Sequence, residues 1–346
     1  MIFEWQQAAW QGLLGRLGQL PHAILLAGQP GSGKSEFAIA LAQRLLCETA
    51  QGADEACGTC DGCRWFIGAN HPDYRLVAPG SDDIEDAAGE GDEAAEAGKP
   101  ATQIRIEQVR ALVDFVIVGA VRQGMRVVVI DPAEAMNHHT ANALLKLLEE
   151  PPARVQFILV SDAPRRLLPT ILSRCRQLAL PRPDAAQAAR WLAAEGVADV
   201  ERLLAVCGGM PVAARELAGG IGADAHARFV RDVLSLDRAD PLALAGAWES
   251  WLKSKDAASA GFGVPQLVDW LQRWVADLIL VAQAGRVRFH PEQQGALAAL
   301  AAKAPLPALL TCYNELQRLR RVAAHPLNLR LLLDDMLLRY ARLVAR

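Results

Sequence analysis

Eight consecutive residues near the start of the chain have the composition of a phosphate-binding loop. Gly28–Ser35 reads GQPGSGKS and matches G-x-x-x-x-G-K-[ST] at every specified position. In such a loop the backbone amides surround phosphates, the lysine neutralises them and the final hydroxyl holds Mg²⁺. We therefore predict a phosphate-binding loop, and its intact residues leave ATP or ADP with Mg²⁺ open as ligands. The predicted contacts are Gly28, Gly31, Gly33, Lys34 and Ser35.

Four cysteines follow the loop with the spacing of a metal site. Cys47, Cys57, Cys60 and Cys63 form C-x9-C-x2-C-x2-C, and four thiolates can close a tetrahedral zinc site. An iron–sulfur cluster and a loop of unligated cysteines are the alternatives. The other cysteines are scattered, which argues against a disulfide framework. We predict structural Zn²⁺ with no open catalytic position.

The groups that would accompany phosphate binding in catalysis are only partly present. ATP hydrolysis needs an acid at the end of a neighbouring strand to help hold Mg²⁺, and usually a carboxylate that positions water. Asp131 ends the apolar run RVVVID and supplies the first. The next residue is Pro132, and Glu134 follows where the chain turns, so we expect its carboxylate to point elsewhere.

Apolar runs predict the elements that position these residues. Continuous runs at 23–27, 126–131 and 155–161 are typical of buried parallel strands. Apolar residues at every third or fourth position predict helices at 104–116 and 139–150. Residues 1–180 are therefore predicted to form an α/β core with a parallel sheet.

The remainder of the chain is predicted to be helical. We expect a small helical lid over residues 181–218 and an all-α domain over 219–346. Two insertions interrupt the α/β core, a cysteine module at about 47–63 and an acidic loop at about 80–100. Eight acids and no Lys or Arg between Ser81 and Gly98 predict a solvated surface loop of unknown role.

Composition restricts the classes of function. No apolar run reaches the 18 residues of a membrane span, and the first residues lack the layout of a signal peptide, so we predict a cytoplasmic protein. Without its acidic segment the chain is mildly basic, which permits contact with DNA without demonstrating it.

Several motifs, taken in order, resemble one family. After GQPGSGKS come CGTCDGC (57–63), HPD (71–73), ANALLKLLEEPP (141–152) and ILSRCR (171–176). The first 180 residues resemble the AAA+ subunits of bacterial DNA polymerase III clamp loaders; the resemblance beyond is weak. It implies an AAA+ P-loop core, a lid and an oligomerising collar. It also implies that Ser173 and Arg174 provide an arginine finger to ATP on a neighbouring subunit, and that Ser161 is a polar sensor.

Two departures distinguish this chain from the motor subunits of that family. Motor subunits carry Asp-Glu at the strand end and an arginine in the lid motif G-x-x-R, whereas here Pro132 follows Asp131 and the lid reads GGMP, ending in Pro211. Arg215 lies about one helical turn beyond. The combination resembles the stationary, delta-prime class of subunit.

That resemblance implies a non-hydrolysing member of a hetero-oligomeric ring. Its partners would be the motor ATPase and delta-type subunits, with which it would help load the sliding clamp on primed DNA as part of the polymerase holoenzyme. Own ATPase activity is expected to be absent. The alternatives are an active motor ATPase, with Glu134 or Arg215 replacing the missing groups, and a phosphoryl-transfer kinase that uses the same loop.

Overall fold

The computed structural model describes residues 2–49, 54–81, 103–117, 120, 124–323 and 328–344. The chain divides into two compact units, Met1–Pro183 and Asp184–Arg346. Apart from its first two residues, the predicted acidic loop at about 80–100 lies outside the described residues.

Five parallel strands form the sheet of the first unit, in the order β2-β3-β4-β1-β5. The strands are β1 (Ala23–Ala27), β2 (Tyr74–Val77), β3 (Arg126–Ile130), β4 (Val155–Ser161) and β5 (Arg176–Ala179). The predicted α/β core with a parallel sheet is confirmed, and its three apolar runs are the three central strands. The prediction missed β2 and β5, because these four-residue edge strands bury less of their surface and lack a continuous apolar run.

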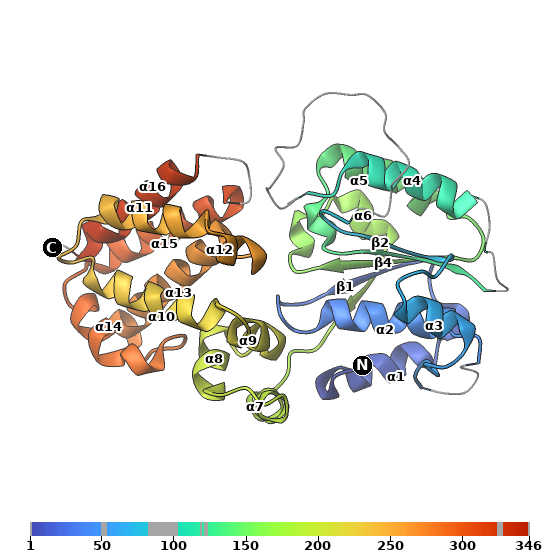
Figure 1. The fold of residues 1–346 in the computed structure, drawn as a ribbon, viewed down its shortest axis with the longest axis horizontal. Helices are drawn as coiled ribbons and strands as arrows, with labels where there is room; N and C mark the ends of the chain where they lie inside the picture. The colour runs from blue at the N-terminus through green and yellow to red at the C-terminus, as the bar shows by residue number, and fades with distance from the viewer. Residues whose placement is uncertain are drawn as a thin grey trace. The chain divides into compact units, whose positions relative to one another are not determined.

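Helices cover both faces of this sheet, as Figure 1 shows. Alternate residues of a strand point to opposite faces, so Leu25 packs toward one helix layer and Ile24 toward the other. One layer consists of α4 (Ile106–Ile117), α5 (His138–Glu149) and α6 (Pro169–Arg174). The other consists of α1 (Gln7–Leu14), α2 (Lys34–Leu46) and α3 (Asp61–Ile67). Short 3₁₀ turns are η1 (Glu4–Gln6), η2 (Leu17–Gln19), η3 (Ala133–Ala135) and η4 (Pro164–Arg166).

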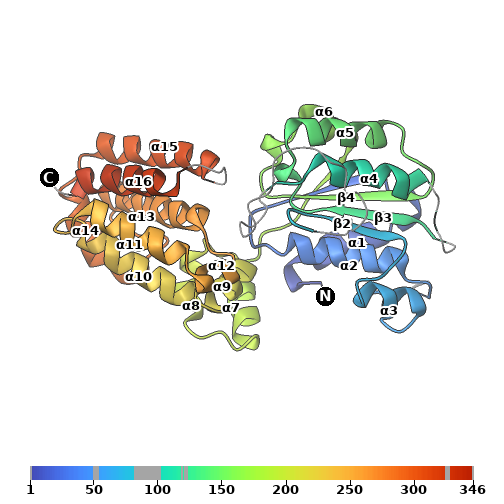
Figure 2. The same cartoon turned by 45° about the horizontal axis from the view of Figure 1, so that its top comes forward.

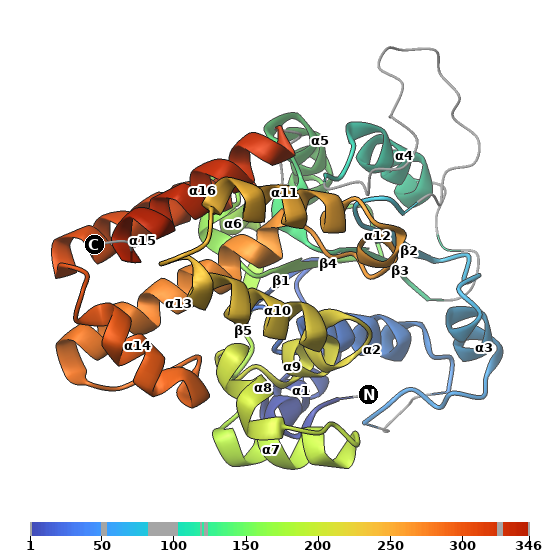
Figure 3. The same ribbon diagram turned by 60° about the vertical axis from the view of Figure 1, so that its left-hand side comes forward.

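The second unit is helical in its described residues. Three short helices, α7 (Ala185–Ala194), α8 (Val200–Val206) and α9 (Pro211–Ala218), lie together and share a small core of their own (Figure 3). The remaining helices are α10 (Gly222–Ser235), α11 (Pro241–Leu252), α12 (Lys255–Ser259), α13 (Val264–Ala284), η5 (Pro291–Gln293), α14 (Gln294–Ala301), α15 (Leu306–Val322) and α16 (Leu329–Val344).

A large core holds these later helices together. In Figure 2, α16 lies beside α15, and it also packs against α11. Trp274 of α13 is fully buried, and its indole N–H donates to the hydroxyl of Tyr340 on α16 at 2.8 Å. Neighbouring Trp270 is also buried, so both tryptophans belong to the core of this unit.

Candidate functional site: phosphate loop, cysteine cluster and Arg174

The phosphate loop joins the central strand β1 to α2. Gly31 and Gly33 have φ angles of 73° and 87°, in the left-handed region that glycine adopts without strain. A Cβ at Gly33 would also lie 2.3 Å from the ring of Phe3. The tight turn and the close approach of the N-terminal segment therefore both require glycine at position 33.

The structure brings the predicted loop residues close to the ends of β3 and β4. Gly28 donates its N–H to the carbonyl of Ser161 at 3.4 Å, and Ser35 hydrogen-bonds to the side chain of Asp131. Burial raises the pKa of Asp131, although the bond from Ser35 acts in the opposite direction. A hydroxyl beside a half-buried carboxylate supplies oxygen ligands of the kind that Mg²⁺ prefers.

Lys34 is already engaged in contacts within the protein. Its buried ammonium donates to the carbonyl of Gln29 at 2.6 Å and forms an ion pair with Asp162. Asp162, directly after β4, was not among the predicted site residues. A signal for it was present, because an acid at the carboxyl end of a strand beside β1 lies at the edge of the sheet where the loop also lies.

Glu134 contacts the same region through the backbone. Its Oε1 accepts the N–H of Asp162 at 2.9 Å, while Oε2 is buried with no hydrogen-bond partner among the described residues. The Oγ of buried Ser161 accepts the N–H of Ala163 at 3.1 Å. Both side chains therefore stabilise the turn that carries Asp162.

The N-terminal segment holds the phosphate loop from outside the strand–loop–helix unit. The indole N–H of Trp5 donates to the carbonyl of Ser32 at 3.0 Å. The amide of Gln6 donates to the carbonyls of Ser32 and Gly33 at 3.1 and 2.8 Å. No pattern in the first residues pointed to these contacts.

The four predicted zinc ligands converge. All four sulfur atoms, from Cys47, Cys57, Cys60 and Cys63, lie within 4.8 Å of one another. The Sγ–Sγ distances are 3.9 Å for Cys47–Cys60 and for Cys57–Cys63. Tetrahedral zinc with Zn–S bonds of about 2.3 Å requires sulfurs about 3.8 Å apart, so this cluster could hold that metal.

Backbone and hydroxyl groups donate to the cluster. The N–H groups of Thr59 and Cys60 donate to Cys57 Sγ at 3.4 and 3.3 Å. The pKa of Cys57 is lowered to about 5, first by the Thr49 side chain and then by these amides. Burial instead raises the pKa of Cys63. A bound cation would favour the thiolate form of both cysteines.

Arg174 is the last residue of α6 and is partly exposed. Its guanidinium contacts Glu149 Oε1 at 2.7 Å and donates to the carbonyl of Thr170 at 3.0 Å. Ser173 donates its hydroxyl to the same carbonyl at 2.9 Å and accepts from Arg174 at 3.3 Å. Glu149, which ends α5, was not predicted as part of this group, although it lies in the motif ANALLKLLEEPP.

Pro211 and Arg215 of the predicted lid lie within the three-helix set of α7, α8 and α9. Pro211 is the first residue of α9, where a missing N–H costs no helical hydrogen bond. Arg215 lies over the ring of Trp191 at 5.3 Å and pairs with Glu195 at 3.7 Å. Arg215 therefore contacts residues of its own three-helix set.

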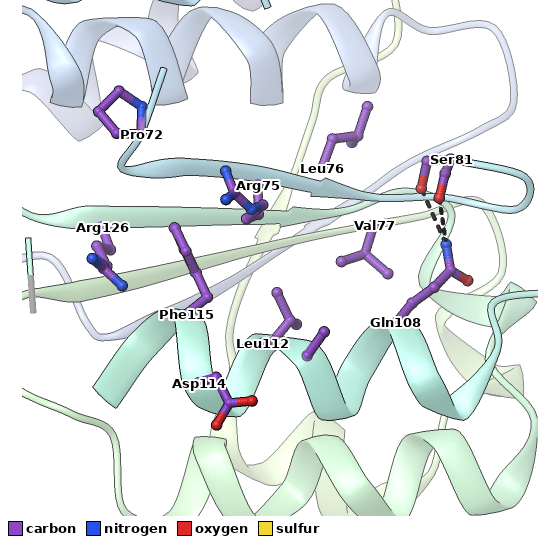
Figure 4. A pocket seen from close by; sticks show the side chains of 11 residues that line it. Pro72, Arg75, Leu76, Val77, Ser81, Gln108, Leu112, Asp114, Phe115 and Arg126 are labelled. Carbon is purple, nitrogen blue, oxygen red and sulfur yellow. Dashed lines mark hydrogen bonds between the residues drawn. The ribbon is translucent and has the colours of Figure 1, made fainter. Parts of the chain in front are cut away.

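The motif HPD and a nearby cavity are separate from the phosphate loop. Asp73 is buried and lies 3.4 Å from Arg126, which places it in a structural ion pair. A cavity of about 390 Å³ lies between β2 and α4, where Gln108 donates to Ser81 (Figure 4). Because β2 is the edge strand and three strands away from β1, this cavity is not the nucleotide site.

The part of the chain that the structure describes contains no helix that is both long and apolar enough to cross a membrane.

Comparison with known proteins gives matches along most of the chain. Residues 7–184 match the family described as DNA polymerase III, delta subunit, and residues 226–342 match its C-terminal family. The delta-prime subunit from Pseudomonas aeruginosa is 40% identical over 286 residues, which span 80% of this chain and 77% of that protein. The Escherichia coli K12 delta-prime subunit is 30% identical over 346 residues, which span 97% of this chain and 94% of that protein. The tau subunit from Salmonella typhimurium is 37% identical over 171 residues, 49% of this chain and 23% of tau.

The parallel sheet, the loop after β1 and the acid after β3 define a P-loop protein of the AAA+ type. With these matches, the chain belongs to the delta-prime subunit family of DNA polymerase III. The predicted resemblance is confirmed.

Proposed function

We propose that this chain is a non-hydrolysing subunit of a clamp-loader ring and supplies Arg174 to the ATP site of a neighbouring subunit. In that role it helps load the sliding clamp on primed DNA in the cytoplasm. Its partners are motor ATPase and delta-type subunits of a hetero-oligomeric complex, consistent with relatives that are delta-prime and tau subunits.

The geometry of Arg174 carries this proposal. Its side chain is 34% exposed, at the end of α6, and contacts with Glu149 and the carbonyl of Thr170 orient its guanidinium. A guanidinium that is oriented but still accessible is suited to stabilise charge on a phosphoryl group brought by another chain. Arg174 and Ser173 are therefore the proposed contributions to catalysis in trans.

The residues of the chain's own site support the non-hydrolysing role. Pro132 stands where a motor subunit carries its water-positioning Glu, and Pro211, in the lid motif, has no group that donates to a phosphate. Nucleotide binding by the phosphate loop, with Asp131 and Ser161 as further contacts, is compatible with this role and is not required by it.

The motor alternative rests on one observation. Glu134 Oε2 is buried without a hydrogen-bond partner among the described residues, so it has a lone pair for a water molecule. We expect the purified chain to show no ATP turnover above a Lys34→Ala control. The hydrogen bond from the N–H of Asp162 to Glu134 Oε1 holds this carboxylate at the turn. Steady-state phosphate release measures this directly. Turnover of about 1 s⁻¹ or more, abolished by Lys34→Ala and by Glu134→Gln, would establish the motor alternative instead.

We further propose the domain roles that accompany this function. Residues 181–218 form the lid and 219–346 the oligomerising collar, attached to an AAA+ core at 1–180 that carries the cysteine module at about 47–63. Zn²⁺ in this module is structural, because four protein sulfurs leave no open position for substrate.

Glu149 is proposed to orient the finger. The pair with Arg174 is partly exposed on both sides, and such pairs contribute about 0.2–1 kcal/mol. Replacing Glu149 by Gln should therefore lower the ATPase of the reconstituted loader by no more than about fivefold, in kcat and with little change in KM. Glu150→Gln removes the same charge one residue further on and is the matched control. Complete loss of activity in Glu149→Gln would contradict a merely orienting role.

A further inference from the structure

One acidic residue at the phosphate loop has a consequence for ligand binding. We propose that Asp162 weakens the binding of nucleoside di- and triphosphates, because it holds Lys34 in an internal ion pair and places a negative charge where the terminal phosphates would lie. The lysine of a phosphate loop reaches the β- and γ-phosphates. A carboxylate in contact with Lys34 Nζ therefore competes with these phosphates for the same cation.

The position of Asp162 is determined by its backbone. Its N–H donates to Glu134 Oε1 at 2.9 Å, and the next N–H, of Ala163, donates to Ser161 Oγ at 3.1 Å. These two bonds hold the turn at the end of β4, the strand that pairs with β1. The backbone of Asp162 is therefore held in place directly beside the loop, and its carboxylate lies within reach of Lys34.

The surrounding charges make this competition effective. The Lys34 side chain is only 4% exposed, although that of Asp162 is 40% exposed, so water screens this ion pair mainly from the side of the carboxylate. Asp131 and Glu134 lie in the same cluster, and both Asp162 and Glu134 act on the Asp131 carboxyl by charge repulsion. A nucleotide brings further negative charge to a cluster of three carboxylates, one of which is already paired with Lys34. Mg²⁺ offsets part of this charge, which is why the effect is on affinity and not an absolute exclusion.

The test is nucleotide binding by the full chain, measured by titration calorimetry with Mg²⁺ and ATP, ADP or AMP. We expect Asp162→Asn to lower the Kd for ATP and for ADP at least tenfold relative to the unmodified chain. AMP has no β- or γ-phosphate, so its binding should not change. Asp162→Ala gives a second variant without a side-chain amide, and thermal melting verifies that both variants are folded.

Two controls separate this effect from a general change of charge. Asp114→Asn removes an exposed carboxylate on α4, far along the sheet from β1, and should leave all three nucleotides unaffected. Adding Lys34→Ala to Asp162→Asn should abolish the gain. The proposal is overturned if both Asp162 variants bind ATP within twofold of the unmodified chain, if no variant binds detectably, or if AMP gains as much as ATP. This binding test on the isolated chain is independent of the proposal for Arg174, which is tested by ATP turnover at the site of a neighbouring subunit.

Discussion

Replacing Arg174 by Ala should lower ATP turnover at the site it serves in the reconstituted loader by roughly 10³-fold or more. A guanidinium contacting the transferring phosphoryl group stabilises charge that develops mainly in the transition state, so the loss should fall on kcat. Arg174→Lys should also be strongly impaired, because an ammonium lacks the planar fork of donors. The measurement is ATPase stimulated by clamp and primed DNA, after gel filtration has established that the ring assembles.

The matched control for the finger is Arg176→Ala. This residue begins β5 and is exposed, so its replacement removes the same charge two positions further along the chain. It should retain most of the stimulated activity. The finger assignment is wrong if the Arg174→Ala complex assembles and the neighbouring site that Arg174 serves still hydrolyses ATP within twofold of its rate in the unmodified complex.

Removal of the metal should unfold the cysteine module. Structural zinc in isolated zinc-finger peptides contributes an apparent binding free energy of about 10–16 kcal/mol at neutral pH, and without it four sulfurs within 4.8 Å have no common cation. We expect one zinc per purified chain by elemental analysis, and close to none in Cys57→Ser after dialysis against a chelator. Limited proteolysis should then cut between residues 54 and 63, and the metal-loaded chain should resist cleavage there.

A buried cysteine in the helical unit is the control for the metal. Cys312→Ser should keep its zinc, because its sulfur lies outside the cluster. Iron with acid-labile sulfide in the purified chain would show an iron–sulfur cluster instead. Equal protease resistance with and without chelator would exclude a structural role for any metal at these cysteines.

Much of the fold could be predicted because apolar runs and helical periodicity mark strands and helices locally in the sequence. The runs at 23–27 and 155–161 are the central strands β1 and β4, with the bounds that the apolar residues predicted. Helix 139–150 is α5, displaced by one residue. The edge strand β5 could not be recognised in the same way, since RQLA is half polar and three of its four residues are exposed.

The cysteine cluster could be predicted from the sequence only in part. Cys57, Cys60 and Cys63 are close in the chain, so their spacing alone predicted convergence. Cys47 directly follows α2 and joins them only because the chain returns to the C-terminal end of that helix.

By itself, the sequence determined which residue types are available for chemistry: a complete phosphate loop, four metal-ligating cysteines and an arginine in the motif SRC. It also determined what is absent, a Glu after Asp131 and an Arg in place of Pro211. The contacts that these groups make follow from the three-dimensional fold. Lys34 pairs with Asp162, and Arg174 with Glu149, because parallel strands and adjoining helix ends bring together residues that are distant in the chain. Charges interact over a few ångströms of space, whatever their separation in sequence, so no local pattern could reveal these pairs.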